Sequence, residues 1–170
     1  NHSTITSGQR VLEMEADAII TLSKTLDDSF ASVVEVLLHA SGRIIVSGMG
    51  KSGLIARKIA ATLASTGTPA LFVHPGEASH GDLGMITRSD VVLLLSNSGE
   101  TPELADMIAY SRRYHIPLVG IASRRDSTLL RKADHAIVLP RAPEACPNGL
   151  APTTSTTLTL ALGDALAVAL

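Results

Sequence analysis

Five short apolar runs recur along this chain, and polar or helical sequence separates each from the next. They fall at residues 43–47, 70–73, 91–95, 118–122 and 136–139. The third run, Val91–Leu95, contains only Val and Leu, which is typical of a strand buried on both faces of a parallel sheet. Helical patterns lie between or after the runs, at residues 53–65, 102–114, 127–132 and 155–170. This alternation predicts an α/β fold in which helices cover both faces of a parallel sheet.

The N-terminal part of the chain has a different pattern. From about residue 10 to residue 40, apolar residues recur at helical spacing, and the acidic pair Asp27-Asp28 interrupts them once. We therefore expect a broken helical segment before an α/β core of residues 43–170. The sequence opens at Asn1 without Met and stops at Leu170 inside an apolar helical pattern, so we expect more chain to follow in the intact protein.

Composition limits the classes of function. The chain has 170 residues, 45% of them hydrophobic, which suits one domain with a substantial core. Its 14 basic and 16 acidic residues nearly cancel and only 2% of residues are aromatic, which argues against nucleic-acid binding. No apolar stretch reaches the ~20 residues that cross a bilayer, and no signal peptide opens the chain. The lone Cys146 excludes an internal disulfide. These features predict a cytoplasmic soluble protein with no membrane or nucleic-acid partner.

A polar cluster follows each of the five predicted strands. They occupy residues 48–53, 74–80, 96–101, 123–126 and 141–146. Because ligands of parallel α/β sheets bind beyond the carboxyl ends of the strands, we expect one ligand site at this edge.

The cluster after the third strand, Ser96-Asn-Ser-Gly-Glu-Thr101, is interpreted as a phosphate cradle. Pro102 suits the first turn of a helix, whose N–H groups and dipole favour an anion. Ser96, Ser98 and Thr101 add hydroxyl donors without adding charge. The alternative is a Ser/Thr-rich helix cap that binds no ligand.

The cluster after the first strand, Gly48-Met-Gly-Lys-Ser-Gly53, matches the dinucleotide fingerprint GxGxxG. However, the second strand ends in Phe-Val-His74, without the acid that a ribose needs. A P-loop does not fit the glycine spacing either. Lys51 and Ser52 at a helix start remain, and together with the cradle they predict a monophosphate site. A tight helix–strand turn without ligand and a nicotinamide-dependent enzyme stay as alternatives.

Two acids and two histidines supply candidate chemistry around the cradle. Glu144 lies on a Pro- and Gly-rich loop and is our candidate general base, with Glu103 as the rival. An exposed loop acid and a helix-stabilising first-turn acid are the alternatives for these two. His74 and His80 match no standard zinc spacing, so we expect substrate contact rather than a structural metal.

Four stretches together identify a resemblance to a known family. They are SGMGKSG, ASTGTPALFVHPGEASHGDLGM, SNSGET and EACPNGLAPTTSTT. Over about residues 10–170 the chain resembles the sugar isomerase (SIS) domain of the arabinose 5-phosphate isomerases. The resemblance implies one SIS domain over residues 1–170. It also implies a three-layer α/β/α fold with a five-stranded parallel sheet, of the flavodoxin-like type.

The resemblance also implies an activity. Members of that family interconvert D-ribulose 5-phosphate and D-arabinose 5-phosphate through an enediol, an early step towards the Kdo sugar of lipopolysaccharide. Such a reaction requires a carboxylate, a donor to the sugar oxygens and an anchor for the phosphate, and it requires no cofactor. The alternative is a non-catalytic SIS module that only binds a sugar phosphate.

The family's functional residues carry over to matching positions of this sequence. Those implicated in catalysis are Lys51, Glu103, Glu144 and His80; those implicated in substrate binding are Ser52, Gly67, Thr68, His74, His80, Ser96, Ser98 and Thr101. His74 is also the expected place of an inhibitory divalent metal such as zinc. Family members continue into a segment with a further active-site histidine, and many add paired CBS domains, neither of which this chain contains. The resemblance further implies a homo-oligomer, dimer or tetramer, with shared active sites.

Overall fold

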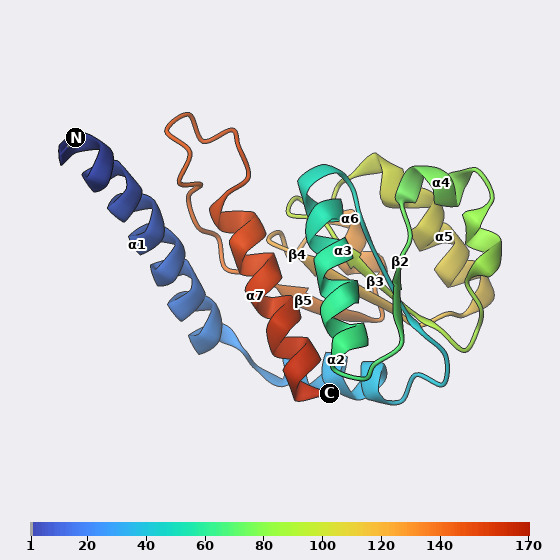
Figure 1. The fold of residues 1–170 in the computed structure, drawn as a ribbon. Helices are drawn as coiled ribbons and strands as arrows, with labels where there is room; N and C mark the ends of the chain where they lie inside the picture. The colour runs from blue at the N-terminus through green and yellow to red at the C-terminus, as the bar shows by residue number, and fades with distance from the viewer. Residues whose placement is uncertain (1) are drawn as a thin grey trace.

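A computed structural model describes residues 2–170 of the chain (Figure 1). Two helices come first, α1 (His2–Thr25) and α2 (Asp28–Leu38). The core then follows as β1 (Ile44–Gly48), α3 (Gly50–Ser65), β2 (Ala70–Phe72), α4 (Pro75–Ser79), η1 (Asp82–Met85), β3 (Val91–Leu95), η2 (Pro102–Leu104), α5 (Ala105–Tyr114), β4 (Leu118–Ala122), α6 (Thr128–Lys132), β5 (His135–Val138) and α7 (Thr154–Ala169).

The five strands form one parallel sheet in the order β2-β1-β3-β4-β5. The chain reverses its direction of strand addition between β1 and β3, so these two neighbours mark the switch point of the sheet. Such a point is where a parallel α/β sheet binds its ligand. The predicted three-layer fold with a five-stranded parallel sheet is confirmed.

Alternate residues of β1, β3, β4 and β5 enter two separate cores, whereas Leu71 of the edge strand β2 is exposed. On one face, Val91, Leu93 and Leu95 of β3 pack in a cluster that contains residues of α1, α2, α3 and α7. On the other face, Val92 and Leu94 pack with residues of α4, α5 and α6. Both faces of β3 are therefore apolar, which explains its unbroken Val and Leu sequence.

The N-terminal helical segment is broken where the sequence predicted. Asp27 caps α2, because its Oδ1 accepts hydrogen bonds from Ser29 N at 2.9 Å and Ser29 Oγ at 2.6 Å. Only Ala18 and Leu22 of α1 are buried, and its first turns stand apart from the body (Figure 1). No helix within residues 2–170 combines the length and apolar character needed to span a membrane.

Three local predictions differ from the structure. The helix α3 begins at Gly50 rather than at residue 53, so the glycine-rich turn is partly helical. The predicted helix at 102–114 opens with the 3₁₀ turn η2, because Pro102 occupies its first position. Residues 75–79, for which the sequence predicted no helix, form α4, because the His74 side chain accepts a hydrogen bond from Gly76 N and Pro75 occupies the first helical position.

Candidate active site

The two ligand-binding turns predicted from the sequence lie next to each other. Strands β1 and β3 pair directly, with Gly48 opposite Leu95. The turns that leave these strands, residues 48–53 and 96–101, therefore begin side by side at the switch point. This arrangement agrees with the prediction that both contribute to one site.

The turn at 48–53 is closed by glycine. A Cβ on Gly53 would lie 2.5 Å from the carbonyl oxygen of Gly48, so no larger residue fits there without movement. Gly50 has a φ of 58°, a left-handed conformation that residues with a side chain adopt less readily than glycine. Met49, the N-cap of α3, makes no side-chain capping bond. Within residues 2–170, no side chain therefore caps the first N–H groups of this 16-residue helix. An anion site at a helix start requires such uncapped N–H groups.

The turn at 96–101 is closed by hydroxyls. The buried Ser96 accepts a hydrogen bond from Gly99 N at 2.9 Å, and its Oγ lies 2.7 Å from Thr101 Oγ1. Ser98 is exposed, and its Oγ accepts a bond from Glu100 N at 3.2 Å. Sequence reasoning gave all three hydroxyls to a ligand. In the structure Ser96 and Thr101 bond within the turn, and Ser98 is the exposed hydroxyl.

Glu144 is held by the start of α7. Its Oε2 accepts hydrogen bonds from Thr153 N at 2.7 Å, Thr153 Oγ1 at 3.0 Å and Ser155 N at 3.3 Å. Burial raises the pKa of Glu144, but the hydrogen bonds from Ser155 and Thr153 together outweigh burial and hold this pKa below its ordinary range. Glu144 is therefore ionised near neutral pH. All three bonds end on one oxygen, which leaves Oε1 for another partner.

One pocket brings these parts together. It has a volume of about 240 Å³, and its lining includes Ser52, Asn97, Glu144 and Ser155. Sequence reasoning placed Ser52 and Glu144 at this edge, and the Thr/Ser run 153–157 that opens the last helix was also expected to line the pocket, as Ser155 does. It missed Asn97, whose signal was the SNSGET motif itself. The pocket thus joins the first turn, the second turn and the candidate base.

Other predicted residues surround this pocket less closely. Lys51 is exposed in the first turn of α3 and forms no ion pair or hydrogen bond with residues 2–170. Glu103 is exposed on η2 and is not among the residues lining the Glu144 pocket. His80 is exposed at the end of α4, and His74 is half-buried at its start. The structure therefore places Glu144, and not Glu103, in the pocket that the two turns share.

Gly67 and Thr68 lie elsewhere. They precede β2, at the amino end of the sheet, and line a separate pocket of about 260 Å³ with Ile44 and Leu170. Within one chain the structure does not bring them to the cradle. Their assignment to substrate binding stays a prediction from the resemblance.

A metal site at His74 has little support from the residues present. Nδ1 of His74 already accepts the hydrogen bond from Gly76 N at 3.1 Å. Among residues 2–170, no three His, Cys, Asp or Glu side chains gather closely enough to hold a metal ion. One imidazole nitrogen is too few ligands for a stable zinc site, so these residues alone do not fit a bound metal.

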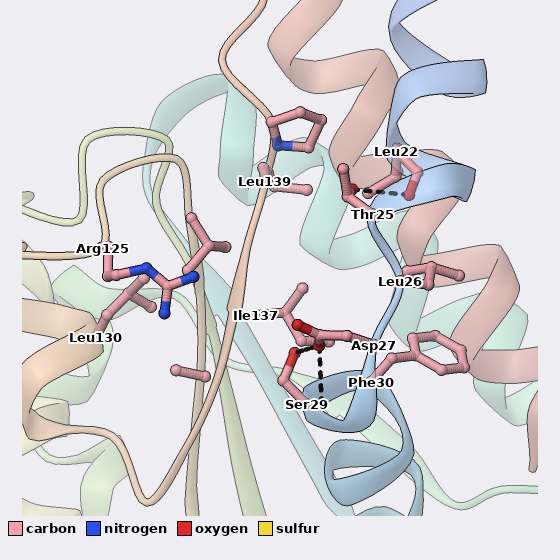
Figure 2. Close-up of a pocket in the computed structure, with 13 residues that line it drawn as sticks. Leu22, Thr25, Leu26, Asp27, Ser29, Phe30, Arg125, Leu130, Ile137 and Leu139 are labelled. Atoms are coloured by element: carbon pink, nitrogen blue, oxygen red, sulfur yellow. Dashed lines mark hydrogen bonds between the residues drawn. The ribbon is translucent and has the colours of Figure 1, made fainter.

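A larger pocket lies along the outer strand of the sheet, and no residue of the two turns lines it. It has a volume of about 600 Å³ and is lined by β5, by the junction of α1 and α2, and by the loop before α6. Figure 2 shows Arg125 on one side of it and Asp27 and Ser29 on the other. Its lining contains none of the predicted site residues. Size alone therefore does not identify the functional pocket of this protein.

Comparisons with known proteins agree with this geometry. The protein named arabinose 5-phosphate isomerase KdsD of Escherichia coli O157:H7 is 52% identical over 164 residues, which are 96% of this chain and 50% of that protein. The protein of the same name from Pseudomonas aeruginosa is 51% identical over 170 residues, which are 100% of this chain and 52% of that protein. The chain thus spans about half the length of the curated relatives it matches.

A solved structure matches the chain over almost its whole length. The E. coli CFT073 protein c3406, in complex with arabinose 5-phosphate, superposes with a TM-score of 0.96 at 40% identity, and the match covers 99% of this chain and 90% of that one. The family model of the SIS domain matches residues 37–169. With this match over most of its length, the chain belongs to the SIS domain family.

Proposed function

We propose that this chain is the catalytic SIS domain of an aldose–ketose isomerase that interconverts D-ribulose 5-phosphate and D-arabinose 5-phosphate. The observation that carries the proposal is the pocket that contains both Ser52, beside the uncapped start of α3, and the ionised Glu144. Curated relatives more than 50% identical carry the name of this activity, and a structural relative that is 40% identical was solved with arabinose 5-phosphate.

In this mechanism the two turns anchor the phosphate and Glu144 moves the proton. The N–H groups at the start of α3 and the hydroxyls of Ser52 and Ser98 bind the phosphate oxygens. Oε1 of Glu144 takes the proton from C2 of the aldose, the enediol forms, and the same oxygen returns the proton to C1. Lys51 stabilises the charge that develops on the sugar oxygens, and His80 moves a proton between them.

The identity of the base is tested by two matched substitutions. We expect Glu144→Gln to lower kcat by about 10³-fold, since a general base contributes roughly 10²–10⁴-fold. Glu103→Gln, which removes the same charge from an exposed position, is expected to lower it by less than about tenfold. Isomerase turnover is measured with ribulose 5-phosphate in a coupled assay. Full activity of Glu144→Gln combined with loss in Glu103→Gln would assign the base to Glu103.

The same assay separates an enzyme from a binding module. A non-catalytic module would bind arabinose 5-phosphate without converting it, whereas an isomerase converts it. The presence of Lys51 and Glu144 beside the phosphate turns favours the enzyme, because binding alone requires only the turns. A nicotinamide-dependent enzyme would show saturable NAD or NADP binding, which we do not expect.

We propose that the arabinose 5-phosphate serves Kdo and lipopolysaccharide synthesis in the cytoplasm. The names of the curated relatives support an arabinose 5-phosphate isomerase, and the first stage of Kdo synthesis uses this product. A relative from Bacteroides fragilis, 37% identical, is described as a phosphosugar isomerase involved in capsule formation, so capsule synthesis is the competing pathway. The Kdo content of cells that lack this protein distinguishes the two.

We also propose a homo-oligomer, a dimer or tetramer with shared active sites. The first helix supports this, because Ile5, Leu12 and Ile20 are 60%, 69% and 50% exposed. Burying these exposed apolar side chains against a second copy would stabilise the pair. Light scattering at micromolar concentration tests the proposal, and a monomer would contradict it.

We propose that turnover needs no cofactor and no metal. Proton transfer through an enediol requires only the carboxylate and the oxygen donors named above. Activity is therefore expected to survive dialysis against EDTA. The resemblance implies inhibition by zinc through His74, which would need further ligands from outside residues 2–170 because His74 alone offers one nitrogen. A His74→Ala variant that stays equally sensitive to zinc would remove His74 from that role.

A further inference from the structure

A second pocket opens at the carboxyl edge beside the Glu144 pocket. It has a volume of about 370 Å³, within the range of small-molecule sites. Asn97 and Ser155 line both pockets, so the two adjoin. The isomerase mechanism above uses none of the other residues of this second pocket.

The second pocket carries positive charge without a matching acid. Arg124, which follows β4, and Arg141, which follows β5, both line it, and its lining contains no Asp or Glu. Arg141 forms no ion pair or hydrogen bond with any residue from 2 to 170. Arg124 has only a long contact, 3.9 Å from Nε to Oδ1 of the 78% exposed Asp126. The two guanidinium groups thus have most of their hydrogen-bond donors available.

The nearby acids are engaged elsewhere. Glu100 accepts a hydrogen bond from Thr128 N at 2.8 Å, and Glu144 accepts its three bonds from Thr153 and Ser155. Neither acid lines the pocket with the arginines. Glu100 and Asp126 attract Arg124 from outside the pocket, so the protein neutralises its positive charge only in part, and no acid faces Arg141 within the lining.

The rest of the pocket fits a small organic anion. Leu139, Pro140 and Leu158 give it an apolar wall, and Ser123 gives it a hydroxyl. Oγ and N of Ser123 both donate to Asn97 O, at 2.7 and 2.9 Å, which ties the loop after β4 to the phosphate cradle. Guanidinium groups bind carboxylates and phosphates through paired hydrogen bonds.

We propose that Arg124 and Arg141 form a second anion subsite next to the phosphate cradle, for a carboxylate or phosphate group. The group belongs either to a separate small anion or to the far end of a ligand anchored in the cradle. The inference rests on the two arginines and their pocket, and it does not require that the chain be an isomerase.

The test measures binding of inorganic phosphate by titration calorimetry. The wild-type chain is expected to bind two phosphates, one in the cradle and one in the subsite. Arg124→Gln/Arg141→Gln is expected to lose one of them, with affinity at least about tenfold weaker, since the paired, charge-assisted hydrogen bonds to the anion are removed. Arg124→Lys/Arg141→Lys, which keeps the charge but not the planar donor pair, should show an intermediate loss.

Two controls keep the outcome specific. Arg88→Gln/Arg125→Gln removes the same two charges from exposed positions outside this pocket, and Arg125 lines the pocket of Figure 2 instead. Ser52→Ala/Ser98→Ala weakens the cradle alone. If the Arg124/Arg141 variant binds both phosphates as the wild type does, or loses no more than the Arg88/Arg125 control, the subsite is disproved. If the arginine variant loses one phosphate while the serine variant binds both, the proposed phosphate anchor fails and the subsite stands.

Ribulose 1,5-bisphosphate then distinguishes the two sources of the anion. A ligand that bridges cradle and subsite binds once per chain and weakens in both the serine and the arginine variants. If the subsite instead holds a separate anion, ribulose 1,5-bisphosphate occupies only the cradle. Its binding then weakens only in the serine variant, and inorganic phosphate still binds in the subsite.

Discussion

The two turns at the switch point are both tight, but for opposite reasons. The turn at 48–53 is tight because side chains are absent, and Gly53 lies where a Cβ would press on the Gly48 carbonyl. The turn at 96–101 is tight because side chains are present, and the hydroxyls of Ser96 and Thr101 bond inside it. The first turn therefore leaves backbone N–H groups for an anion, whereas the second uses part of its polar groups for its own shape.

This difference changes how a hydroxyl-rich motif is interpreted. A Ser/Thr-rich sequence suggests that every hydroxyl contacts the ligand. In the structure the buried Ser96 is a brace, a side chain that stabilises the turn through hydrogen bonds within it, and Ser98 is the hydroxyl exposed to solvent. Loss of a brace lowers stability, and loss of a ligand contact lowers affinity. The two effects can be measured separately.

The largest expected effect is on the hydroxyl-closed turn. Gly99 has a φ of 69°, and a Cβ there would overlap both Oγ and Cβ of Ser127. We expect Gly99→Ala to lower the free energy of unfolding by about 2–4 kcal/mol, from backbone strain and overpacking together. Urea denaturation measures it. The control is Gly84→Ala, where nothing lies within 4 Å of the added Cβ; equal effects of the two substitutions would contradict the prediction.

A smaller effect is expected in the glycine-closed turn. Gly53→Ala places a Cβ 2.5 Å from a backbone oxygen, which costs about 1–3 kcal/mol, but Ala favours the helix α3 by up to about 1 kcal/mol. The net loss of unfolding free energy, again measured by urea denaturation, is thus expected to stay below that of Gly99→Ala. A stabilised variant would show that helix propensity outweighs the contact with Gly48.

The brace and the ligand contact separate in a pair of serine variants. Ser96→Ala removes two hydrogen bonds of a buried side chain and should lower the unfolding free energy by about 1–2 kcal/mol. Ser98→Ala should change it by less than about 0.5 kcal/mol, as is usual for exposed positions, but should weaken phosphate binding more than Ser96→Ala does. If Ser98→Ala is the more destabilising of the two, the assignment of roles is reversed.

The smallest expected effect concerns the pH dependence of Glu144. Its pKa in the folded protein is depressed, so the stabilisation from its hydrogen bonds is present above the pKa of the unfolded chain and is lost as pH falls through the folded pKa. Thr153→Val removes the Oγ1 donor and should raise this pKa, which moves the acid limb of kcat/KM to higher pH.

Thr156→Val is the matched control for that shift. Thr156 Oγ1 donates only to the backbone carbonyls of Pro152 and Thr153, so its loss leaves the bonds of Glu144 intact. If the acid limb moves equally in both variants, the Thr153 hydroxyl does not set the pKa that the pH profile reports.

Local pattern was enough to predict the sheet and the edge that carries the site. Unbroken apolar runs such as Val91–Leu95 require burial on both faces, and helices between them require parallel strands. The break near Asp27 was also visible, because the acidic pair Asp27-Asp28 interrupts the apolar residues that recur at helical spacing. The small helix α4 was missed because His74, an uncommon N-cap, supplies its capping bond.

The candidate site was predicted only in part, because strand order is not a local property. It cannot be read from the sequence, yet the adjacency of β1 and β3 is what places residues 48–53 beside residues 96–101. Gly67 and Thr68 follow a helix and precede a strand, so they lie at the amino edge, away from the cradle of their own chain.

The sequence by itself determined the fold class, the carboxyl edge and the residue types available there, because periodicity and turn chemistry are local properties. Only the tertiary structure decided which of those residues are buried, which bond to one another and which line a pocket. It buried Ser96 as a brace, joined three donors to one oxygen of Glu144, and set Arg124 and Arg141 into one pocket. Such roles depend on distances between residues far apart in the chain, and the packing of the helices against the sheet fixes those distances.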